Sequence, residues 1–424
     1  MTEQTEHLVR LIGARLAQPG TAPAPARAHA GWQQSLARGI PGIALLHIEL
    51  AATGRAPWQH AHDWLTAAAA APLTVGADSH PFHGGPALAH ALACATEQQP
   101  GAYHRALHAL DEQIIIDTER RLAAAHHRID QRQLPEIAEY DVIRGLTGYG
   151  AYLLRRHPDT DTLHGVLDYL VRLTRPITHD GEKLPGWWTL SGPSGRPDPH
   201  FAGGHANAGV AHGIAGPLSL LALAKLKGVE VYGQHNAMGD ISWWLDRWAT
   251  PRGRGPAWPY WITRDELRAR RPAPAGPSRP SWCYGAAGQA RAQQLASLAR
   301  KDDVRQFRAE TALLNALTDS ARLAATTDIS LCHGYAGLAH LTARAASDAL
   351  PDTRDQLKAL IPGLLDAVVP PDTTAVAQVA DALLQTADGN GAGFLDGAAG
   401  VALAVLAADT GQAVTRWDAC LLTA

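Results

Sequence analysis

Seven short glycine turns recur along the chain, and each is followed by an apolar run rich in alanine and leucine. The first glycines of the turns are Gly39, Gly84, Gly145, Gly213, Gly285, Gly334 and Gly397. Six turns read Gly-x-x-Gly, and the second ends in Ala87 instead. Successive first glycines lie between 45 residues (39 to 84) and 72 residues (213 to 285) apart. A repeat of this size suits two helices joined by loops of variable length.

The repeat predicts an all-α chain built from seven helical hairpins, in which each glycine turn starts the second helix. Alanine and leucine are strong helix formers, and glycine lets helices approach closely. The stretches between turns, such as 162–175 and 305–325, also have helical composition. Few stretches alternate as strands do, and candidate short strands lie within 183–190 and 257–263. The spacing leaves open whether the stack of hairpins stays open or closes into a ring.

Composition excludes several classes of protein. Hydrophobic residues make up 46% of the chain and charged residues 18%, which is typical of a globular protein. The net charge of −3 provides no basic footprint for nucleic acid. The acidic N-terminal stretch does not resemble a secretory signal, and no apolar run reaches the ~18 residues that span a bilayer. We therefore expect a cytoplasmic protein without a membrane span, whose four cysteines stay reduced and either bind metal or lie buried.

Two columns of the repeat carry polar side chains. The residue before the first glycine is polar or ionisable in all seven turns: Arg38, His83, Arg144, His212, Tyr284, His333 and Asp396. The residue two before it is apolar except at Cys283 and Cys332. If the repeats stack around an axis, the first column faces a shared polar space. Helix capping is the alternative, but arginine, histidine and tyrosine are poor N-caps.

Cys283, Cys332 and His333 form the sharpest constellation. Two thiolates and one imidazole suit Zn²⁺ in tetrahedral geometry and leave the fourth position open, as in catalytic zinc sites. The two cysteines are far apart in the chain, so the site requires two repeats to meet in space. The alternative is a pair of small buried cysteines in a helical core. Their shared column favours metal binding.

Four motifs resemble those of the lanthionine synthetase C (LanC-like) family, and the resemblance covers nearly the whole chain. The motifs are WCYG at 282–285, CHG at 332–334, AHGIAG at 211–216 and YDVIRGLTG at 140–148. The resemblance implies an α/α toroid, in which a ring of outer helices surrounds a ring of inner helices. It also implies a single domain over residues 1–424, with room for short insertions within 150–205 and 217–280.

The family joins cysteine thiols of a ribosomal precursor peptide to dehydroalanine or dehydrobutyrine, which gives lanthionine or methyllanthionine rings. Carried onto the matching positions, the resemblance implies Cys283, Cys332 and His333 as zinc ligands and His212, Asp141, Arg279 and Tyr284 as catalytic residues. His212 is the implied acid or base, and Asp141 is implied to orient it. Zn²⁺ lowers the pKa of a bound thiol, and an imidazole with a pKa of about 6.5 exchanges protons near neutral pH. Whether His212 takes the thiol proton or only delivers the final one is left open.

The leading interpretation is a stand-alone cyclase that acts on a dehydrated precursor peptide after a separate dehydratase. One alternative is a LanC-like protein that adds glutathione to dehydrated peptides, and the same zinc residues would serve it. A second alternative is a non-catalytic, leader-binding scaffold on the same fold, which the intact Cys283, Cys332 and His212 argue against. Two features stay unexplained: His205 either lines the site or lies in a solvated loop, and residues 289–300 are more polar than their counterparts.

Overall fold

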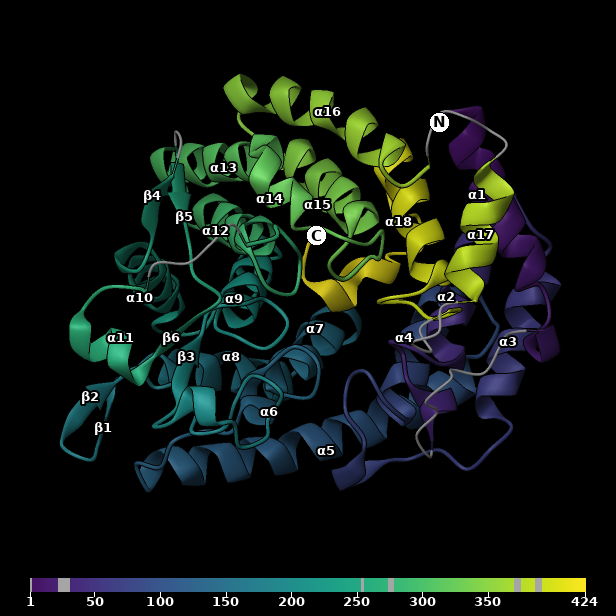
Figure 1. The fold of residues 1–424 in the computed structure, drawn as a ribbon. Coiled ribbons are helices and arrows are strands. Elements are labelled where there is room, and N and C mark those ends of the chain that lie inside the picture. The colour runs from purple at the N-terminus through teal and green to yellow at the C-terminus, as the bar shows by residue number, and fades with distance from the viewer. Residues whose placement is uncertain (1, 22–30, 253–254, 274–277, 370–374, 386–390) are drawn as a thin grey trace. The chain divides into compact units, whose positions relative to one another are not determined.

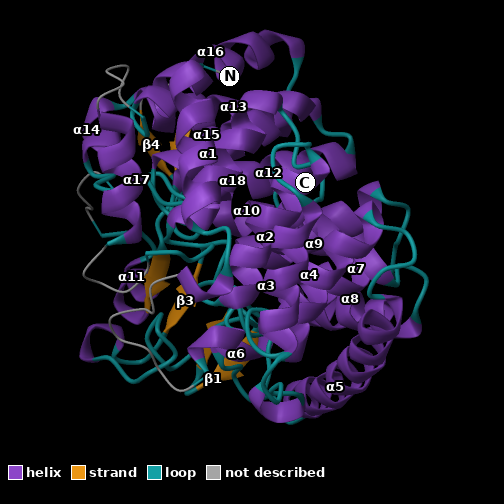
Figure 2. Ribbon diagram, turned by 90° about the vertical axis from the view of Figure 1, so that its right-hand side faces the viewer, coloured by secondary structure: helices purple, strands orange, loops and turns teal. Residues whose placement is uncertain are grey.

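The computed structural model describes residues 2–21, 31–252, 255–273, 278–369, 375–385 and 391–424 (Figure 1). Helices dominate these residues, and the few strands are short (Figure 2). The chain divides into two compact units. The first unit comprises Met1–Ile114, Thr326–Asp348 and Arg354–Asp418, and the second comprises Ile115–Ala325, Ala349–Thr353 and Ala419–Ala424. Among the described residues, no helix is both long and apolar enough to cross a bilayer.

The first unit holds the helices of both ends of the sequence. These are α1 (Glu3–Arg15), α2 (Ile40–Ala52), α3 (Trp58–Ala69), α4 (Gly85–Gln98), the start of α5 (His104–Asp130), α15 (Tyr335–Asp348), most of α16 (Pro351–Asp366), α17 (Val376–Leu384) and α18 (Ala398–Thr410). The helices α15, α18, α2 and α4 pack against one another in that order. Because α18 packs on α2, the last repeat lies beside the first.

The second unit holds the middle of the sequence. Its helices are the end of α5, α6 (Ile137–Tyr140), α7 (Leu146–Arg156), α8 (Asp161–Leu173), α9 (Ala215–Leu226), α10 (Gln234–Arg247), α11 (Arg264–Ala269), α12 (Ala286–Arg300), α13 (Asp303–Thr318) and α14 (Ser320–Ala324). Its strands are β1 (Ile177–His179), β2 (Glu182–Leu184), β3 (His205–Asn207), β4 (Thr250–Arg252), β5 (Gly255–Ala257) and β6 (Trp261–Thr263). They pair antiparallel as β1–β2, β3–β6 and β4–β5. Helix α9 packs between α7 and α12.

The predicted hairpins are confirmed in their order. Each glycine turn starts one of α2, α4, α7, α9, α12, α15 and α18. The inner helices are buried on nearly all sides; in α18, every residue from Ala398 to Ala408 is buried. A helix that is apolar all round belongs in a core rather than at a surface. The expected strands are found in part, as β2 and β6.

A ladder of backbone hydrogen bonds links the glycine turns of neighbouring repeats. In each rung, the carbonyl two residues before a first glycine accepts an N–H from the preceding turn, and the first turn accepts from the last. The rungs are Leu36 N to Phe82 O (2.9 Å), Val142 N to Ala211 O (3.1 Å), Val210 N to Cys283 O (3.0 Å), Cys332 N to Leu395 O (2.8 Å) and Phe394 N to Ala37 O (2.8 Å). Because the rungs join corresponding segments of neighbouring turns, the ladder aligns these turns within each unit.

The second glycine of the turn is required by a close approach. A Cβ at Gly337 would overlap the carbonyl oxygen of Leu331, and one at Gly288 would overlap that of Trp282. Both carbonyls lie three residues before the first glycine of their own turn. The first helical turn therefore sits directly on the segment that carries the cysteine, and only glycine leaves room for it.

The polar helix α12 has a structural reason for its composition. Arg291 is only 2% exposed, and its guanidinium donates to the Thr423 carbonyl (2.9 Å) and to Gln294 Oε1 (2.5 Å). Gln294 in turn donates to Glu310 of α13 (2.8 Å). Buried polar groups are stable when they are hydrogen-bonded in this way. The network ties the C-terminal tail and α13 to α12 within the second unit.

Candidate metal and acid–base site

The Cys283 loop is locked to the loop of the preceding repeat. The Cys283 side chain is 7% exposed, and the Ser281 hydroxyl lies 3.7 Å from its sulfur. The Cys283 carbonyl accepts the ladder bond from Val210 N. A Cβ at Gly209 would lie 2.6 Å from the same carbonyl oxygen, so only glycine allows this approach. The backbone thereby fixes where the cysteine side chain starts.

His212 and Asp141 form a hydrogen-bonded pair, as the resemblance implies. His212 Nδ1 lies 2.7 Å from Asp141 Oδ2, and the ladder bond from Val142 N to Ala211 O places the two residues side by side although 71 positions separate them. Asp141 is fully buried, and its Oδ1 also accepts the N–H groups of Arg144 (2.7 Å) and Gly145 (2.8 Å). The carboxylate is therefore held from behind by backbone donors and from the front by the imidazole.

The pair fixes the tautomer of the imidazole. A carboxylate can only accept, so the His212 Nδ1 atom carries the hydrogen and the neutral ring presents a lone pair at Nε2. The side chain of His212 is 30% exposed, whereas that of Asp141 is 1% exposed. The imidazole is thus oriented from the buried side and accessible on the other. This is the arrangement of a general base or acid with an orienting carboxylate.

Tyr284 lies beside His212, with ring centroids 6.1 Å apart. Its hydroxyl accepts a hydrogen bond from Asn207 Nδ2 (3.0 Å). The Asn207 amide has one orientation because its Oδ1 accepts the Gly209 N–H (3.0 Å). Since Asn207 donates to the hydroxyl oxygen, the hydroxyl hydrogen of Tyr284 is left to donate elsewhere. Asn207 is fully buried and was not singled out by the sequence, where no motif marks it.

Arg279 lies at the edge of the same group. Its backbone carbonyl accepts a hydrogen bond from the Tyr260 hydroxyl (2.9 Å), and burial raises the pKa of Tyr260. The rings of Tyr260 and Trp261 stand 5.8 and 5.9 Å from the Tyr284 ring. These contacts position the loop through its backbone. A role for the Arg279 guanidinium stays a prediction.

The Cys332 loop carries an imidazole between two carboxylates. Cys332 is partly buried, and its backbone N–H is held by the ladder bond to Leu395. His333 Nε2 lies 3.3 Å from Asp328 Oδ2, and Nδ1 lies 3.7 Å from Asp396 Oδ1. A histidine that binds a metal through one nitrogen usually donates the other to a carboxylate. Whichever nitrogen of His333 faces a metal, a carboxylate stands near the other.

Cys283, Cys332 and His333 could together hold a metal ion. No other group of three such side chains is found in the part of the chain that the structure describes. Two sulfurs and an imidazole nitrogen are donors that Zn²⁺ prefers. The chemistry of the donor set therefore fits zinc.

His205 does not lie in a solvated loop, which was one of the two interpretations of the sequence. It is fully buried in β3, with its ring 4.6 Å from that of Phe201. Burial lowers its pKa to about 4, so the ring is neutral at pH 7. Its place is in the packing behind the Asn207 and His212 loop.

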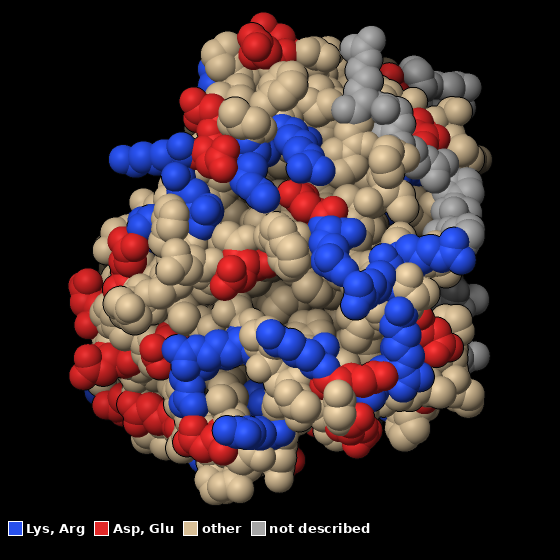
Figure 3. Space-filling model, turned by 90° about the vertical axis from the view of Figure 1, so that its left-hand side faces the viewer, with Lys and Arg blue, Asp and Glu red and all other residues tan. Residues whose placement is uncertain are grey.

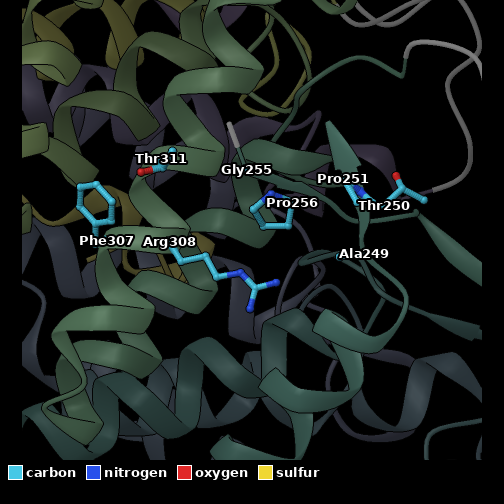
Figure 4. A pocket seen from close by; sticks show the side chains of 8 residues that line it. All are labelled: Ala249, Thr250, Pro251, Gly255, Pro256, Phe307, Arg308 and Thr311. Carbon is cyan, nitrogen blue, oxygen red and sulfur yellow. The ribbon is translucent and has the colours of Figure 1, made fainter. Parts of the chain in front are cut away.

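A cavity of about 360 Å³ lies elsewhere in the second unit, between α13 and the β4–β5 hairpin. Figure 4 shows Phe307, Arg308 and Thr311 on one side and Pro251 and Pro256 on the other. None of the predicted site residues lines it. The size of a cavity is therefore a poor guide to the chemistry of this chain.

Comparison with known proteins agrees with the motifs. The chain is 28% identical over 207 residues to the nisin biosynthesis protein NisC of Lactococcus lactis subsp. lactis, and the match covers 47% of each sequence, about half the length of that relative. The solved structure of nisin cyclase matches with a TM-score of 0.74 at 22% identity and covers 94% of both chains, so the fold is its α/α toroid. The family model for lanthionine synthetase C-like protein matches residues 31–422. The chain therefore belongs to the lanthionine synthetase C-like protein family.

Proposed function

We propose that the chain is a zinc-dependent lanthipeptide cyclase, which adds cysteine thiols of a precursor peptide to dehydroalanine or dehydrobutyrine. The observation that carries the proposal is the His212–Asp141 pair, which lies in the same unit as Cys283 and is reached through the same ladder of backbone bonds. An oriented imidazole in the same unit as a cysteine that can ligate zinc suits a reaction that moves one proton and forms one C–S bond. Membership of the family supports the same reaction.

Cys283, Cys332 and His333 are the residues that would hold the zinc ion. Bound there, Zn²⁺ supplies a Lewis acid that makes an incoming thiol acidic enough to ionise near neutral pH. Asp328 or Asp396, whichever lies at the nitrogen that does not face the metal, would orient the His333 ring for this role. The cysteine ligands need a compartment that keeps thiols reduced, and the cytoplasm meets that need.

His212 handles the proton of the reaction. The substrate sulfur, after losing its proton, forms a bond to the β-carbon of the dehydro residue, and the C=C electron pair moves to the α-carbon as an enolate. A proton on the α-carbon completes the addition, so the thiol hydrogen is replaced by a C–H and no other reactant is consumed. His212 delivers this proton from Nε2 and is recharged by the proton from a thiol. Asp141 stabilises the imidazolium between these steps.

Tyr284 is placed to assist at the carbonyl. The addition develops negative charge on the carbonyl oxygen next to the α-carbon. Because Asn207 occupies the acceptor side of the Tyr284 hydroxyl, that hydroxyl can donate a hydrogen bond to the developing charge. The substrate is expected to be a precursor peptide that a separate dehydratase has already treated, since the reaction consumes dehydro residues.

Metal analysis and thiol counting test the proposal together. The purified protein is expected to contain about one equivalent of zinc, and Cys332→Ala and Cys283→Ala are each expected to lose it. Incubation with a dehydrated peptide should remove free thiols without changing the peptide mass, since the addition is an isomerisation. Cys420→Ala, a partly buried cysteine outside the column, is the control and should keep metal and activity. A Cys332→Ala protein that retains both would refute the ligand set.

The same assay separates cyclisation from glutathione addition. Glutathione added to the reaction should leave the product mass unchanged if the peptide's own thiol attacks. A product heavier by one glutathione, with the peptide thiols still free, would instead assign the chain to intermolecular thiol transfer. A protein that binds the peptide and zinc but consumes no thiol would be a scaffold.

A further inference from the structure

A cationic pocket in the second unit has no role in the proposed chemistry. It has a volume of about 320 Å³ and lies at the C-terminal ends of α5 and α8, next to β1. Four arginines line it: Arg128, Arg132, Arg172 and Arg175. No aspartate or glutamate is among its described lining residues. A concave surface lined by one sign of charge concentrates the field and favours an oppositely charged ligand.

Two of the four arginines are already paired. Arg128 makes a bidentate contact with Glu139 (2.6–3.1 Å), and Arg172 contacts Asp130 (2.6 Å). These pairs neutralise the inner part of the pocket and hold its shape. The positive charge that remains to bind an anionic ligand is therefore that of the other two arginines.

Arg132 and Arg175 are exposed and have no carboxylate partner among the described residues. Arg132 sits in left-handed backbone just past the end of α5, with φ 55°, and Arg175 follows the end of α8. The helix dipole favours a cation near a helix C-terminus, which explains why an arginine lies at the end of each helix. It does not account for two unpaired guanidinium groups that line one cavity. On the face shown in Figure 3, basic and acidic side chains interleave.

The rest of the lining selects a peptide over a small anion. Leu173, Pro176 and Ile177 add apolar surface beside the arginines. Strand β1 pairs only with β2 in a two-stranded sheet, so its other edge has no strand partner within the described residues. A phosphate ion would leave the apolar surface and the strand edge unused. A peptide segment with alternating acidic and aliphatic side chains would use all three features.

We propose that this pocket binds an acidic segment of the peptide substrate, with its carboxylates on Arg132 and Arg175. The identity of the ligand as a peptide substrate rests on the proposed function. The pocket lies on different elements from the zinc and His212 residues, so it acts as a docking site that holds the peptide while the thiol reacts elsewhere. Guanidinium groups bind carboxylates through two parallel hydrogen bonds, which gives both affinity and direction.

The test measures binding of two labelled peptides to the full-length protein by fluorescence anisotropy. One peptide carries an Asp-Glu-Asp-Leu run, and the matched peptide carries Asn-Gln-Asn-Leu. We expect the acidic peptide to bind more tightly, and the double variant Arg132→Gln/Arg175→Gln to weaken it by about tenfold. The control Arg105→Gln/Lys358→Gln removes the same charge from two exposed residues outside the pocket and should bind like the parent protein.

Several outcomes would overturn the proposal. These are equal binding of the two peptides, equal loss in the control variant, or full displacement of the acidic peptide by inorganic phosphate at constant ionic strength. Because the assay measures binding, it is independent of ring formation. A protein that forms no rings but binds the acidic peptide through Arg132 and Arg175 would refute the proposed function and keep the pocket.

Discussion

Two imidazoles of the candidate site have carboxylate partners, one in each unit, and they differ in how firmly they are held. His212 faces the fully buried Asp141 at 2.7 Å, and two backbone N–H groups hold that carboxylate in place. His333 stands between Asp328 at 3.3 Å and Asp396 at 3.7 Å, whose side chains are 35% and 17% exposed. One imidazole has a single fixed tautomer, and the other has a carboxylate near each nitrogen.

The difference matches the two tasks proposed for these residues. A proton carrier needs one nitrogen fixed and the other free, because a tautomer switch would remove the reactive lone pair. A metal ligand needs either nitrogen to be available and the other to have a hydrogen-bond acceptor. Both histidines occupy the same column of the repeat, directly before a first glycine. The repeat fixes where the imidazole stands, and the carboxylates around it decide what it can do.

The largest expected effect separates these two imidazoles. His212→Ala should lower kcat/KM for ring formation by about 10²–10⁴-fold and leave the zinc content unchanged, since it removes only the proton carrier. His333→Ala should lose zinc as well as activity. The measurement is ring formation on a dehydrated peptide alongside metal analysis of each purified variant. If His212→Ala loses metal, or if His333→Ala keeps it with normal activity, the division of tasks is wrong.

The conservative variant Asp141→Asn tests whether the carboxylate fixes the tautomer of His212. Asp141→Asn keeps an oxygen for the backbone donors of Arg144 and Gly145 but turns an NH₂ group toward His212. An NH₂ group can only donate, so the ring must move its hydrogen to Nε2 and lose the reactive lone pair. We expect a loss of about 10²-fold in kcat with an unchanged thermal midpoint. A variant as active as the parent protein would show that the tautomer is not fixed by this contact.

Each unit also carries a buried histidine with a strongly lowered pKa, so acid tests the stability of both units. Burial lowers the pKa of His47 in the first unit and of His205 in the second to about 4. The unfolded chain binds these protons at about pH 6.5, so it holds more protons than the folded chain between pH 6.5 and 4. The free energy of unfolding should therefore fall as pH drops through this window, by up to about 3 kcal/mol for each histidine.

Chemical denaturation at a series of pH values measures this loss. His47→Leu and His205→Leu should each flatten the slope of the unfolding free energy between pH 6.5 and 4. An exposed control, His104→Leu, should leave the slope as it is. If one buried variant flattens the slope and the other does not, acid acts on only one of the two units. A slope that neither variant changes would contradict both shifted pKa values.

Most of the fold could be predicted from the glycine turns. Their spacing gave seven hairpins and placed each inner helix, because small residues followed by Ala–Leu runs leave few other choices. The contact of the last repeat with the first could not be predicted from spacing, because it depends on the curvature that accumulates from repeat to repeat, and only the family resemblance implied it. The polar composition of α12 could not be explained from the sequence either, since Thr423, which Arg291 of this helix contacts, lies more than a hundred residues away. Long-range partners of this kind leave no local pattern.

The candidate site also contains residues that local motifs predict and residues that only tertiary contacts reveal. His212, Asp141, Cys283, Cys332 and His333 could all be chosen from motifs and from the register of the repeat. Asn207 could not be chosen in this way, because asparagine is common in turns and a single one before a glycine turn indicates only a loop. The carboxylates beside His333 were equally hidden, since Asp328 and Asp396 come from two different turns. Residues that act through another residue depend on tertiary distances, which spacing does not encode.

Substitutions at Asn207 have the smallest expected effect and test how the Tyr284 hydroxyl beside His212 is positioned. Asn207 is proposed as a positioning residue: its amide donates to the Tyr284 hydroxyl oxygen, so that this hydroxyl donates to another acceptor. Tyr284→Phe should cost about tenfold in kcat, and Asn207→Ala should cost somewhat less. If Asn207 acts only through Tyr284, the double variant should be no worse than Tyr284→Phe alone.

Asn207→Asp tests the direction of the hydrogen bond between residue 207 and the Tyr284 hydroxyl. A carboxylate can still accept from Gly209 N but cannot donate to Tyr284, so the Tyr284 hydroxyl would donate to it and its hydrogen would be captured. Asn207→Asp should therefore be slower than Asn207→Ala, although it is the closer isostere. The reverse order, at equal thermal stability and with unchanged KM, would mean that the buried amide serves the packing of β3 and not the hydroxyl beside His212.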